Sequence, residues 1–391
     1  MSLYSRRLPW SFSPNRITRL IEEKRRSGAP LLDLTISNPT EQLPHYPHLQ
    51  IANAYASIPD LSYRPHPLGS EQARHEIVNV YRESGVRLII DQIALTASSS
   101  EGYALLFKLL CDPGDEILIP VPSYPLFEYL AALECVRTVP YRLIYDGSWS
   151  IDCTDLRQRL SPRSRAIVVV NPNNPTGSFL NSAECELVLM LARDRRIPVI
   201  SDEVFMDYRF PEQADSAPTL AGQDSTLAFC LNGLSKMAAM PQMKLGWIAI
   251  GGPAKEREAA RTRLELLLDT YLSVSTPVQA VLRELLTIGA ENRRILKSRI
   301  AGNLSNLRKL LVHQPVHALH AQGGWSIILR LPNTQSEEAW TTRLLDDEGT
   351  VVQPGYFFDM SSEPYIVLSL ITPEEIFAEG ISRIVGLANR S

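Results

Sequence analysis

The amino-acid sequence predicts an α/β fold, in which a large domain with a mostly parallel sheet flanked by helices is joined to a smaller α+β domain. Three observations lead to this prediction. Strand-like and helix-like stretches alternate between about residues 92 and 250, several strands are continuous apolar runs, and the pattern changes after about residue 255. Such alternation is typical of parallel sheets with helices on both faces, because their strands are buried on both sides.

The expected elements of the large sheet follow one another in order. Strands are expected at 92–96, 116–120, 165–170, 197–202, 227–233 and 245–252. Helices are expected at 101–110, 126–134 and 183–195. A turn with Pro113 and Gly114 separates the first helix from the second strand. Ligands of such sheets bind beyond the carboxyl ends of the strands, so the polar residues that follow each strand are the candidate site residues.

The last third of the chain has a different pattern. A long helical stretch runs from about 255 to the segment TYLSVSTP, and further helices reach about residue 312. Strand-like pieces follow at 323–332, 351–358 and 365–372, with a helix between the first two and a closing helix. We therefore expect a large domain at 46–265 and a smaller domain formed by residues 1–45 and 266–391.

Composition and residue spacing argue against several kinds of partner and site. The chain has 391 residues, 45% of them hydrophobic and 21% charged, and a net charge of −4, which argues against nucleic-acid or anionic-membrane partners. Five scattered cysteines form no CxxC motif, which fits reduced thiols in a cytoplasmic protein, and no apolar run is long enough to span a membrane. His313, His317 and His320 have helical spacing, but Pro315 interrupts it, so we expect no metal site.

Five clusters of polar or aromatic residues follow the expected strands. They are TASSSEG (96–102), PSYP (122–125), NPNNPTG (171–177), SDEVF (201–205) and a stretch with two lysines, Lys236 and Lys244. Each cluster alone has a simpler interpretation, namely a helix cap, a packed tyrosine, a turn, or a surface charge. Asp202 is harder to explain, because a carboxylate at the end of a buried strand needs a partner.

In their order and spacing, these clusters together resemble the class I/II aminotransferases, which are pyridoxal 5′-phosphate (PLP) enzymes with the aspartate-aminotransferase fold. The resemblance covers nearly the whole chain, since the segments ISNPT, YRPHPLG, GGW and VVQPG also match. It implies the PLP-dependent transferase fold (fold type I), PLP as cofactor, and a homodimer with a shared active site.

The resemblance also implies roles for single residues around the ring of the cofactor. Lys236 would hold PLP as a Schiff base and then move protons as base and acid. Asp202 would keep the pyridine nitrogen protonated, which makes the ring an electron sink. Asn174 would hydrogen-bond the phenolic oxygen of the ring, and Tyr124 would stack on the ring face.

Other residues match the family's binding site for the cofactor phosphate. Ser98, Ser99 and Ser100 would bind the phosphate at a helix N-terminus. Lys244 stands where relatives usually have arginine, so it would balance the phosphate charge with less directional bonds. Tyr63 would reach the phosphate of the neighbouring subunit.

Three positions depart from the family pattern. Phe205 stands where relatives carry a tyrosine that donates to the ring oxygen, and Gly233 stands where they carry a serine. Val367 replaces an arginine that clamps the carboxylate of the substrate. Arg64 is one candidate substitute for that arginine; alternatively, backbone groups hold the substrate, or the substrate lacks an α-carboxylate.

The substrate-facing residues are predicted less directly. In ISNPT, Ser37 stands where relatives often have a substrate-facing glycine, and Asn38 lies beside it. Aromatic residues at 356–358 and Trp325 form either an aromatic pocket for the substrate or part of the core of the smaller domain. The sequence does not distinguish these interpretations.

The resemblance implies an aminotransferase (transaminase, EC 2.6.1.-) that moves an amino group from an amino donor to a 2-oxo acid by a ping-pong mechanism. Two alternatives stay open. The same Lys236 and Asp202 could serve a PLP-dependent C–S lyase that catalyses β-elimination, or the chain could be a non-catalytic PLP-binding module. The identity of the substrate does not follow from the sequence.

Overall fold

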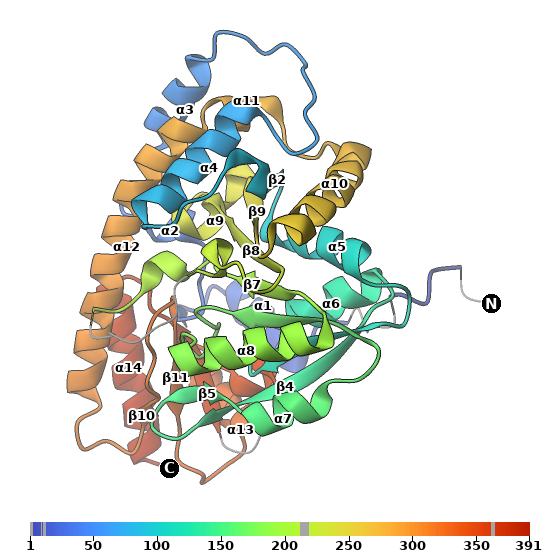
Figure 1. Ribbon diagram of the computed structural model, residues 1–391. Helices are drawn as coiled ribbons and strands as arrows, with labels where there is room; N and C mark the ends of the chain where they lie inside the picture. The colour runs from blue at the N-terminus through green and yellow to red at the C-terminus, as the bar shows by residue number, and fades with distance from the viewer. Residues whose placement is uncertain (1–2, 9, 11–12, 212–218, 361–363) are drawn as a thin grey trace.

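The computed structural model describes residues 3–8, 10, 13–211, 219–360 and 364–391. Figure 1 shows the helices arranged around a central sheet, with a second, smaller sheet near the C-terminus and the N-terminal segment projecting to one side. The two sheets are separate, and a short parallel pair, β1 (Leu32–Asp33) with β12 (Thr350–Val351), ties the N-terminal segment to the C-terminal part.

Within the described residues, the larger sheet has eight strands in the order β2-β9-β8-β7-β6-β3-β4-β5. Its strands are β2 (Ile93–Thr96), β3 (Glu116–Val121), β4 (Arg137–Tyr145), β5 (Trp149–Ile151), β6 (Ser164–Val170), β7 (Val199–Asp202), β8 (Ala228–Gly233) and β9 (Gly246–Gly251). β9 runs antiparallel to β2 and β8, and β5 runs antiparallel to β4, while the strands between them are parallel. The carboxyl ends of β6, β7 and β8 therefore lie at one edge.

Alternate residues of these strands enter two apolar cores, one on each face of the sheet. On β7, for example, Ile200 packs into one core and Val199 into the other. The first core is closed by α5 (Ser99–Leu110), α6 (Leu126–Leu133) and α10 (Ala254–Tyr271). The second is closed by α3 (His48–Ala56), α4 (Glu71–Glu83), α7 (Cys153–Arg159), α8 (Ser182–Arg195), α9 (Leu234–Met237) and α11 (Thr276–Ala280).

The smaller sheet is antiparallel, with the strand order β10-β11-β14-β13. Its strands are β10 (His317–Ala318), β11 (Ser326–Arg330), β13 (Gln353–Pro354) and β14 (Tyr365–Ser369). Ile327 and Leu368 pack on one face into a third core, which also takes residues of α13 (Glu337–Asp346) and α14 (Glu374–Asn389). Leu34 and Leu43, from the N-terminal segment, belong to the same core.

One helix links the two sheets. α12 (Leu282–Leu310) has 29 residues, and its first turns pack against the larger sheet while its second half packs against the smaller one. The other helices and 3₁₀ turns in the described part of the chain are α1 (Arg16–Arg26), α2 (Pro39–Gln42), η1 (Ile90–Gln92), η2 (Met206–Tyr208), η3 (Leu220–Gly222), η4 (Pro241–Met243) and η5 (Gly355–Phe358).

The predicted α/β class with a mostly parallel sheet and a second, smaller sheet is confirmed. One expected strand is wrong in part, because only 350–351 and 353–354 pair as strands and residues 355–358 form the 3₁₀ turn η5. The division into domains at residues 45/46 and 265/266 stays a prediction.

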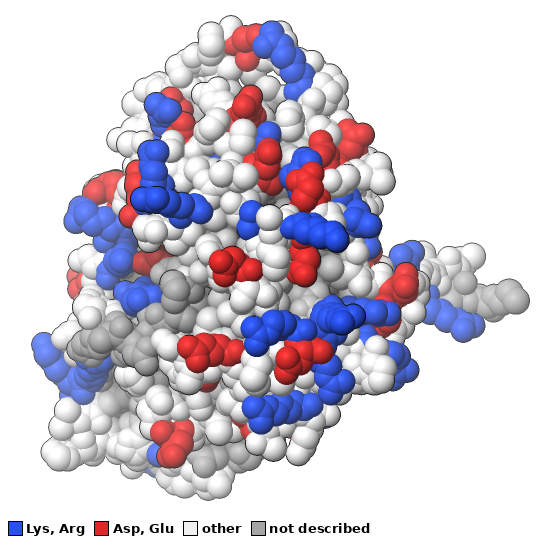
Figure 2. Space-filling model, viewed as in Figure 1, with Lys and Arg blue, Asp and Glu red and all other residues white. Residues whose placement is uncertain are grey.

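None of the described helices combines the length and the apolar character that a bilayer crossing requires. On the face in Figure 2, basic side chains are interspersed with acidic ones.

Candidate active site

Lys236 lies on a tightly held turn directly after β8. We call residues 233–239 the lysine turn. Four consecutive carbonyl groups of this turn, at residues 236 to 239, each accept a hydrogen bond from a side chain elsewhere in the fold. The donors are, in order, Tyr208 (2.8 Å), Arg293 (2.9 Å), Asn292 (3.1 Å) and Tyr46 (3.1 Å). The backbone that carries the amine is therefore fixed before any ligand binds.

The lysine turn also depends on a glycine in α12. A Cβ atom at Gly289 would lie 2.3 Å from the Cβ and 2.6 Å from the Cα of Ala238, far inside van der Waals contact. We expect Gly289→Ala to separate α12 from the lysine turn and to lower the free energy of unfolding by about 1–3 kcal/mol. Urea denaturation measures this loss.

Gly302→Ala on the same helix is the matched control, since its Cβ would meet only the end of the Glu374 side chain, at 2.8 Å. This control should be close to neutral, because a flexible side chain can move aside and alanine favours a helix over glycine. Equal losses in the two variants would show that the contact with Ala238 is unimportant.

The surroundings of the Lys236 amine are aromatic. Its Nζ lies 4.8 Å from the ring centroid of Trp325 and 5.5 Å from that of Phe205. Burial lowers the pKa of the amine to about 8, and the charge of Asp202 opposes this shift. An amine with this pKa can both accept and donate a proton near neutral pH.

Asp202 ends β7, the strand next to β8. Its Oδ1 accepts a hydrogen bond from the Val204 N–H at 3.2 Å, and its Oδ2 accepts one from the Tyr103 hydroxyl at 3.0 Å. Burial raises the pKa of this carboxyl to about 6, although both hydrogen bonds and the charge of Lys236 lower it. The acid and the amine therefore lie close enough to affect each other's pKa.

The serine cluster begins helix α5. Ser98 is the N-cap residue, and its hydroxyl accepts a hydrogen bond from the Glu101 N–H at 3.1 Å. The first N–H groups of a helix have no partner within it, so those of Ser99 and Ser100 can donate to an anion. Backbone from three segments converges here, because a Cβ at Gly246 would lie 3.2 Å from Ser99 N and one at Gly233 would lie 2.9 Å from Gly246 Cα.

The loops PSYP and NPNNPTG are tied to each other. Ser123 Oγ donates to Asn173 Oδ1 at 2.9 Å, and Asn173 Nδ2 donates to the Pro122 carbonyl at 3.0 Å. Asn174, the next residue, accepts a hydrogen bond from Ser326 Oγ of β11 at 3.1 Å, so the smaller sheet reaches the candidate site. Tyr124 stays 48% exposed beside these loops.

Other predicted residues lie outside this cluster or have structural partners. Lys244 is exposed and has a left-handed backbone conformation, and the side chain of Tyr63 is 75% exposed. Ser37 is exposed, and Asn38 caps the short helix α2 by accepting from Thr40 N–H at 3.2 Å. The structure therefore gives Asn38 a capping role, and among the described residues it shows no hydrogen bond of the Ser37 side chain.

The structure shows which residues surround Val367 and the other positions that bear on substrate binding. Val367 is 1% exposed and packs in an apolar cluster with Ile328 and Phe358. Phe358 and Phe357 belong to that cluster, which agrees with the interpretation of these rings as core. Trp325 instead lies at the Lys236 amine. Arg64 is paired with Asp60 at 2.9 Å on an exposed loop.

Tyr103 was not identified as a site residue from the sequence, and Tyr208 was considered only as a substitute for the hydroxyl missing at Phe205. Tyr103 contacts Asp202 from helix α5, and Tyr208 hydrogen-bonds the Lys236 carbonyl. Neither belongs to a motif, and only the packing of α5 and η2 against the strands brings them to the site.

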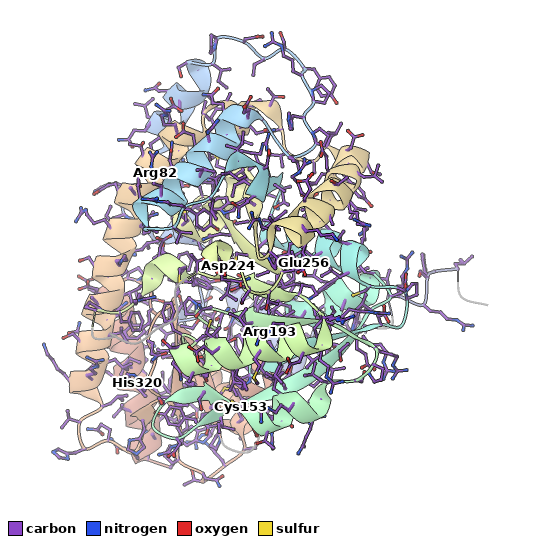
Figure 3. All side chains as sticks on the ribbon, viewed as in Figure 1. Arg82, Cys153, Arg193, Asp224, Glu256 and His320 are labelled. Atoms are coloured by element: carbon purple, nitrogen blue, oxygen red, sulfur yellow. The ribbon has the colours of Figure 1, made fainter. Side chains whose placement is uncertain are left out.

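A separate cavity of about 560 Å³ lies by the amino ends of β7 and β8. Figure 3 shows two of its lining residues, Arg193 on α8 and Glu256 on α10.

Comparison with known proteins agrees with this geometry. A family profile described as aminotransferase class I and II matches residues 30–378. Glutamate-pyruvate aminotransferase AlaA of Escherichia coli K12 is 30% identical over 264 residues, which cover 67% of this chain and 64% of the relative, slightly less than two thirds of its length. Tyrosine aminotransferase of Mus musculus is 26% identical over 96% of this chain and 84% of its own.

Solved structures show the same architecture. Alanine aminotransferase from Pyrococcus furiosus superposes with a TM-score of 0.87 at 25% identity, covering 99% of this chain and all of the other. An aspartate aminotransferase variant of Thermus thermophilus superposes with a TM-score of 0.84 at 22% identity, which bears on the fold alone. With a family match over most of its length and an amine, a carboxylate and a helix N-terminus gathered at one sheet edge, the chain belongs to the class I and II aminotransferase family.

Proposed function

We propose that the chain is a PLP-dependent aminotransferase that exchanges an amino group between an amino donor and a 2-oxo acid. The observation that carries the proposal is the placement of a buried amine, Lys236, with a pKa of about 8, near the Asp202 carboxyl at the ends of neighbouring strands, where each group shifts the pKa of the other. The names of the matched relatives, alanine, tyrosine and glutamate-pyruvate aminotransferases, support the reaction class but not one substrate.

The donor set fits PLP, which is an aldehyde on a phosphorylated pyridine ring. Lys236 offers an amine to the aldehyde, Asp202 offers an acceptor to the ring nitrogen, and the start of α5 offers N–H groups to the phosphate. When bound, PLP supplies the electron-withdrawing ring that stabilises negative charge on the carbon next to the amino group. We propose the further contacts at Asn174 and Tyr124.

The residues of the chain supply proton transfer and positioning. Because the pKa of Lys236 is about 8, roughly a tenth of the amine is neutral at pH 7 and can accept a proton. Asp202 holds negative charge close by, and the four hydrogen bonds to the lysine turn keep the amine in one place. Trp325 and Phe205 keep water away from the amine on their side.

We propose that the active protein is a cytoplasmic homodimer. The support is the exposed loop with Tyr63, whose family counterpart contacts the phosphate in the neighbouring subunit. Lys244 would balance the phosphate of the PLP that Lys236 holds in its own subunit. Ser37 and Asn38 would face the substrate. Sedimentation analysis of the PLP-loaded protein should give twice the mass of the chain, and a stable, active monomer would contradict this part of the proposal.

The reaction is tested by mixing the PLP-loaded protein with a panel of amino donors in the absence of an oxo acid. Transamination converts the absorption band of the bound cofactor once and releases one equivalent of oxo product per site. Repeated release of oxo acid and ammonia would instead show a lyase. Borohydride fixation of PLP on Lys236 without reaction toward any donor would show a binding module.

Phe205→Tyr tests the placement of the phenolic oxygen of PLP. A hydroxyl at this position would stabilise the ionised ring oxygen, so we expect the pH midpoint of the cofactor absorption band to fall by about one unit. Spectral titration measures the midpoint. Phe179→Tyr is the control and should leave the midpoint unchanged, because the buried Phe179 ring faces the Arg209 guanidinium, whereas the rings at the Lys236 amine are those of Phe205 and Trp325. An identical midpoint in Phe205→Tyr would contradict the placement.

A further inference from the structure

Helix α5 places a buried tyrosine behind the aspartate that ends β7. The hydroxyl of Tyr103 donates to Asp202 Oδ2 at 3.0 Å, while the Val204 N–H donates to Oδ1 at 3.2 Å. Among the described residues, each carboxylate oxygen therefore has one hydrogen-bond donor. Since two donors on different oxygens resist rotation of the carboxylate, its orientation is fixed.

The ring of Tyr103 has little freedom to turn away. The residue is 3% exposed, its ring meets Phe127 edge-on at a centroid distance of 5.3 Å, and it meets Phe107 at 5.9 Å. A hydroxyl in such apolar surroundings is costly unless it is hydrogen-bonded. The packing of α5 and α6 therefore keeps the hydroxyl on Asp202.

We propose that Tyr103 is a positioning residue that keeps Asp202 ionised and oriented, so that the proton shared between Asp202 and the ring nitrogen of PLP lies on the nitrogen. This inference rests on the proposed function, because it needs PLP at the site. It is independent of the identity of the amino donor, since it concerns only whether the proton lies on Asp202 or on the ring nitrogen.

A hydrogen bond from a neutral hydroxyl stabilises a carboxylate more than a carboxylic acid. Burial of Asp202 acts in the opposite direction and raises its pKa to about 6, which favours a proton on oxygen. The Lys236 charge also lowers the pKa of Asp202, but that amine takes part in the reaction. Tyr103 is the constant donor, because burial raises its own pKa well above that of free tyrosine and keeps the hydroxyl protonated.

The test locates the proton directly. Wild-type protein, Tyr103→Phe and Tyr103→Leu are loaded with PLP that carries ¹⁵N in the ring, and the ¹⁵N resonance distinguishes a protonated nitrogen from an unprotonated one. Tyr141→Phe is the matched control, because it removes another buried hydroxyl, which donates to the Val168 carbonyl at 2.8 Å. Phe and Leu differ in shape but both lack the hydroxyl.

We expect both Tyr103 variants to move the ¹⁵N resonance toward the unprotonated position, since losing one hydrogen bond to a charged group should change the ratio of the two proton positions roughly tenfold to a hundredfold. Tyr141→Phe should leave the resonance at the wild-type position. Binding of a PLP analogue with C–H in place of the ring nitrogen should be the same in Tyr103→Phe and wild type, because this analogue shares no proton.

Three results overturn the inference. They are a wild-type ¹⁵N resonance in both Tyr103 variants, an equal shift in Tyr141→Phe, and an equal loss of affinity for PLP and the C–H analogue, which would give Tyr103 a packing role alone. Wild-type protein that binds no PLP would overturn the proposed function itself, so the two failures are distinguishable.

Discussion

Replacing Lys236 by alanine is expected to abolish covalent attachment of PLP and to reduce turnover with any amino donor by at least roughly a thousandfold. The reason is that one amine serves two purposes, as the group that bonds the cofactor and as the group that moves the proton. Its pKa of about 8 suits both purposes near neutral pH. Borohydride reduction followed by peptide mass analysis measures attachment, and single-turnover absorbance measures the reaction.

Lys255→Ala is the control, since Lys255 is an exposed lysine of α10 outside the site. This variant should keep both attachment and turnover. If the Lys236 variant still carried the reduced cofactor, the attachment point would be another lysine, and the assignment of this turn would be wrong.

Asp202→Asn is expected to have opposite effects on activity and on stability. Asparagine has nearly the same shape but no charge, so it cannot stabilise a protonated ring nitrogen, and we expect turnover to fall roughly a hundredfold to a thousandfold. The variant should also lower the pKa of Lys236 further, because the charge of Asp202 raises it. Stopped-flow absorbance across pH measures both effects.

The stability of the cofactor-free protein should change in the other direction. The pKa of Asp202 is about 6 in the folded protein and 3.8 in the reference state, so the folded protein keeps a proton that the unfolded chain loses between these values. Its stability therefore falls as the pH rises through this window, and the full cost, at most about 3 kcal/mol, is present above pH 6.

We therefore expect Asp202→Asn without PLP to resist urea better than wild type at pH 8, and the difference to shrink toward pH 4. Asp60→Asn, on an exposed loop, is the control and should show no such gain at pH 8. A variant less stable than wild type at pH 8 would show that Asp202 is not strained by its burial.

The candidate cofactor-binding residues at the strand ends were predictable because they follow strands in recognisable strings. Lys236 and Asp202 each come at the end of an apolar run, and parallel strands bring such ends to one edge. Their supporting partners were not predictable in the same way. Tyr103 reaches Asp202 only because α5 packs on β8 and β9, beside the end of β7, and no local pattern encodes which helix covers which strand.

The surroundings of two departures from the family pattern, Gly233 and Val367, are also revealed only by the structure. Gly233 and Gly246 face each other across β8 and β9, where a Cβ would collide with the opposite backbone, so the missing serine at 233 has a packing reason. Val367 lies in a closed apolar cluster. A residue type at one position does not reveal such neighbours.

The fold was predicted best where the chain is most apolar. β6 and β7 are continuous buried runs and were expected nearly at their observed bounds. β4 was missed because it lies near the edge, is largely exposed, and contains Pro140 and two arginines, so it lacks the pattern of a buried strand. The antiparallel direction of β9 was not predictable, since periodicity does not encode strand direction.

Helix α12 connects the lysine turn to the smaller sheet through side-chain hydrogen bonds. About one turn before its midpoint, Asn292 and Arg293 hold the lysine turn. About two turns past its midpoint, Asn303 donates to the carbonyls of Leu370 and Thr372 beyond β14. Because α12 is held at both places, a rotation of the smaller sheet would also move the backbone around the Lys236 amine, unless the helix bends between the two contacts. Amide hydrogen exchange should therefore be fastest in the helix between residues 294 and 302 when a substrate drives such a rotation.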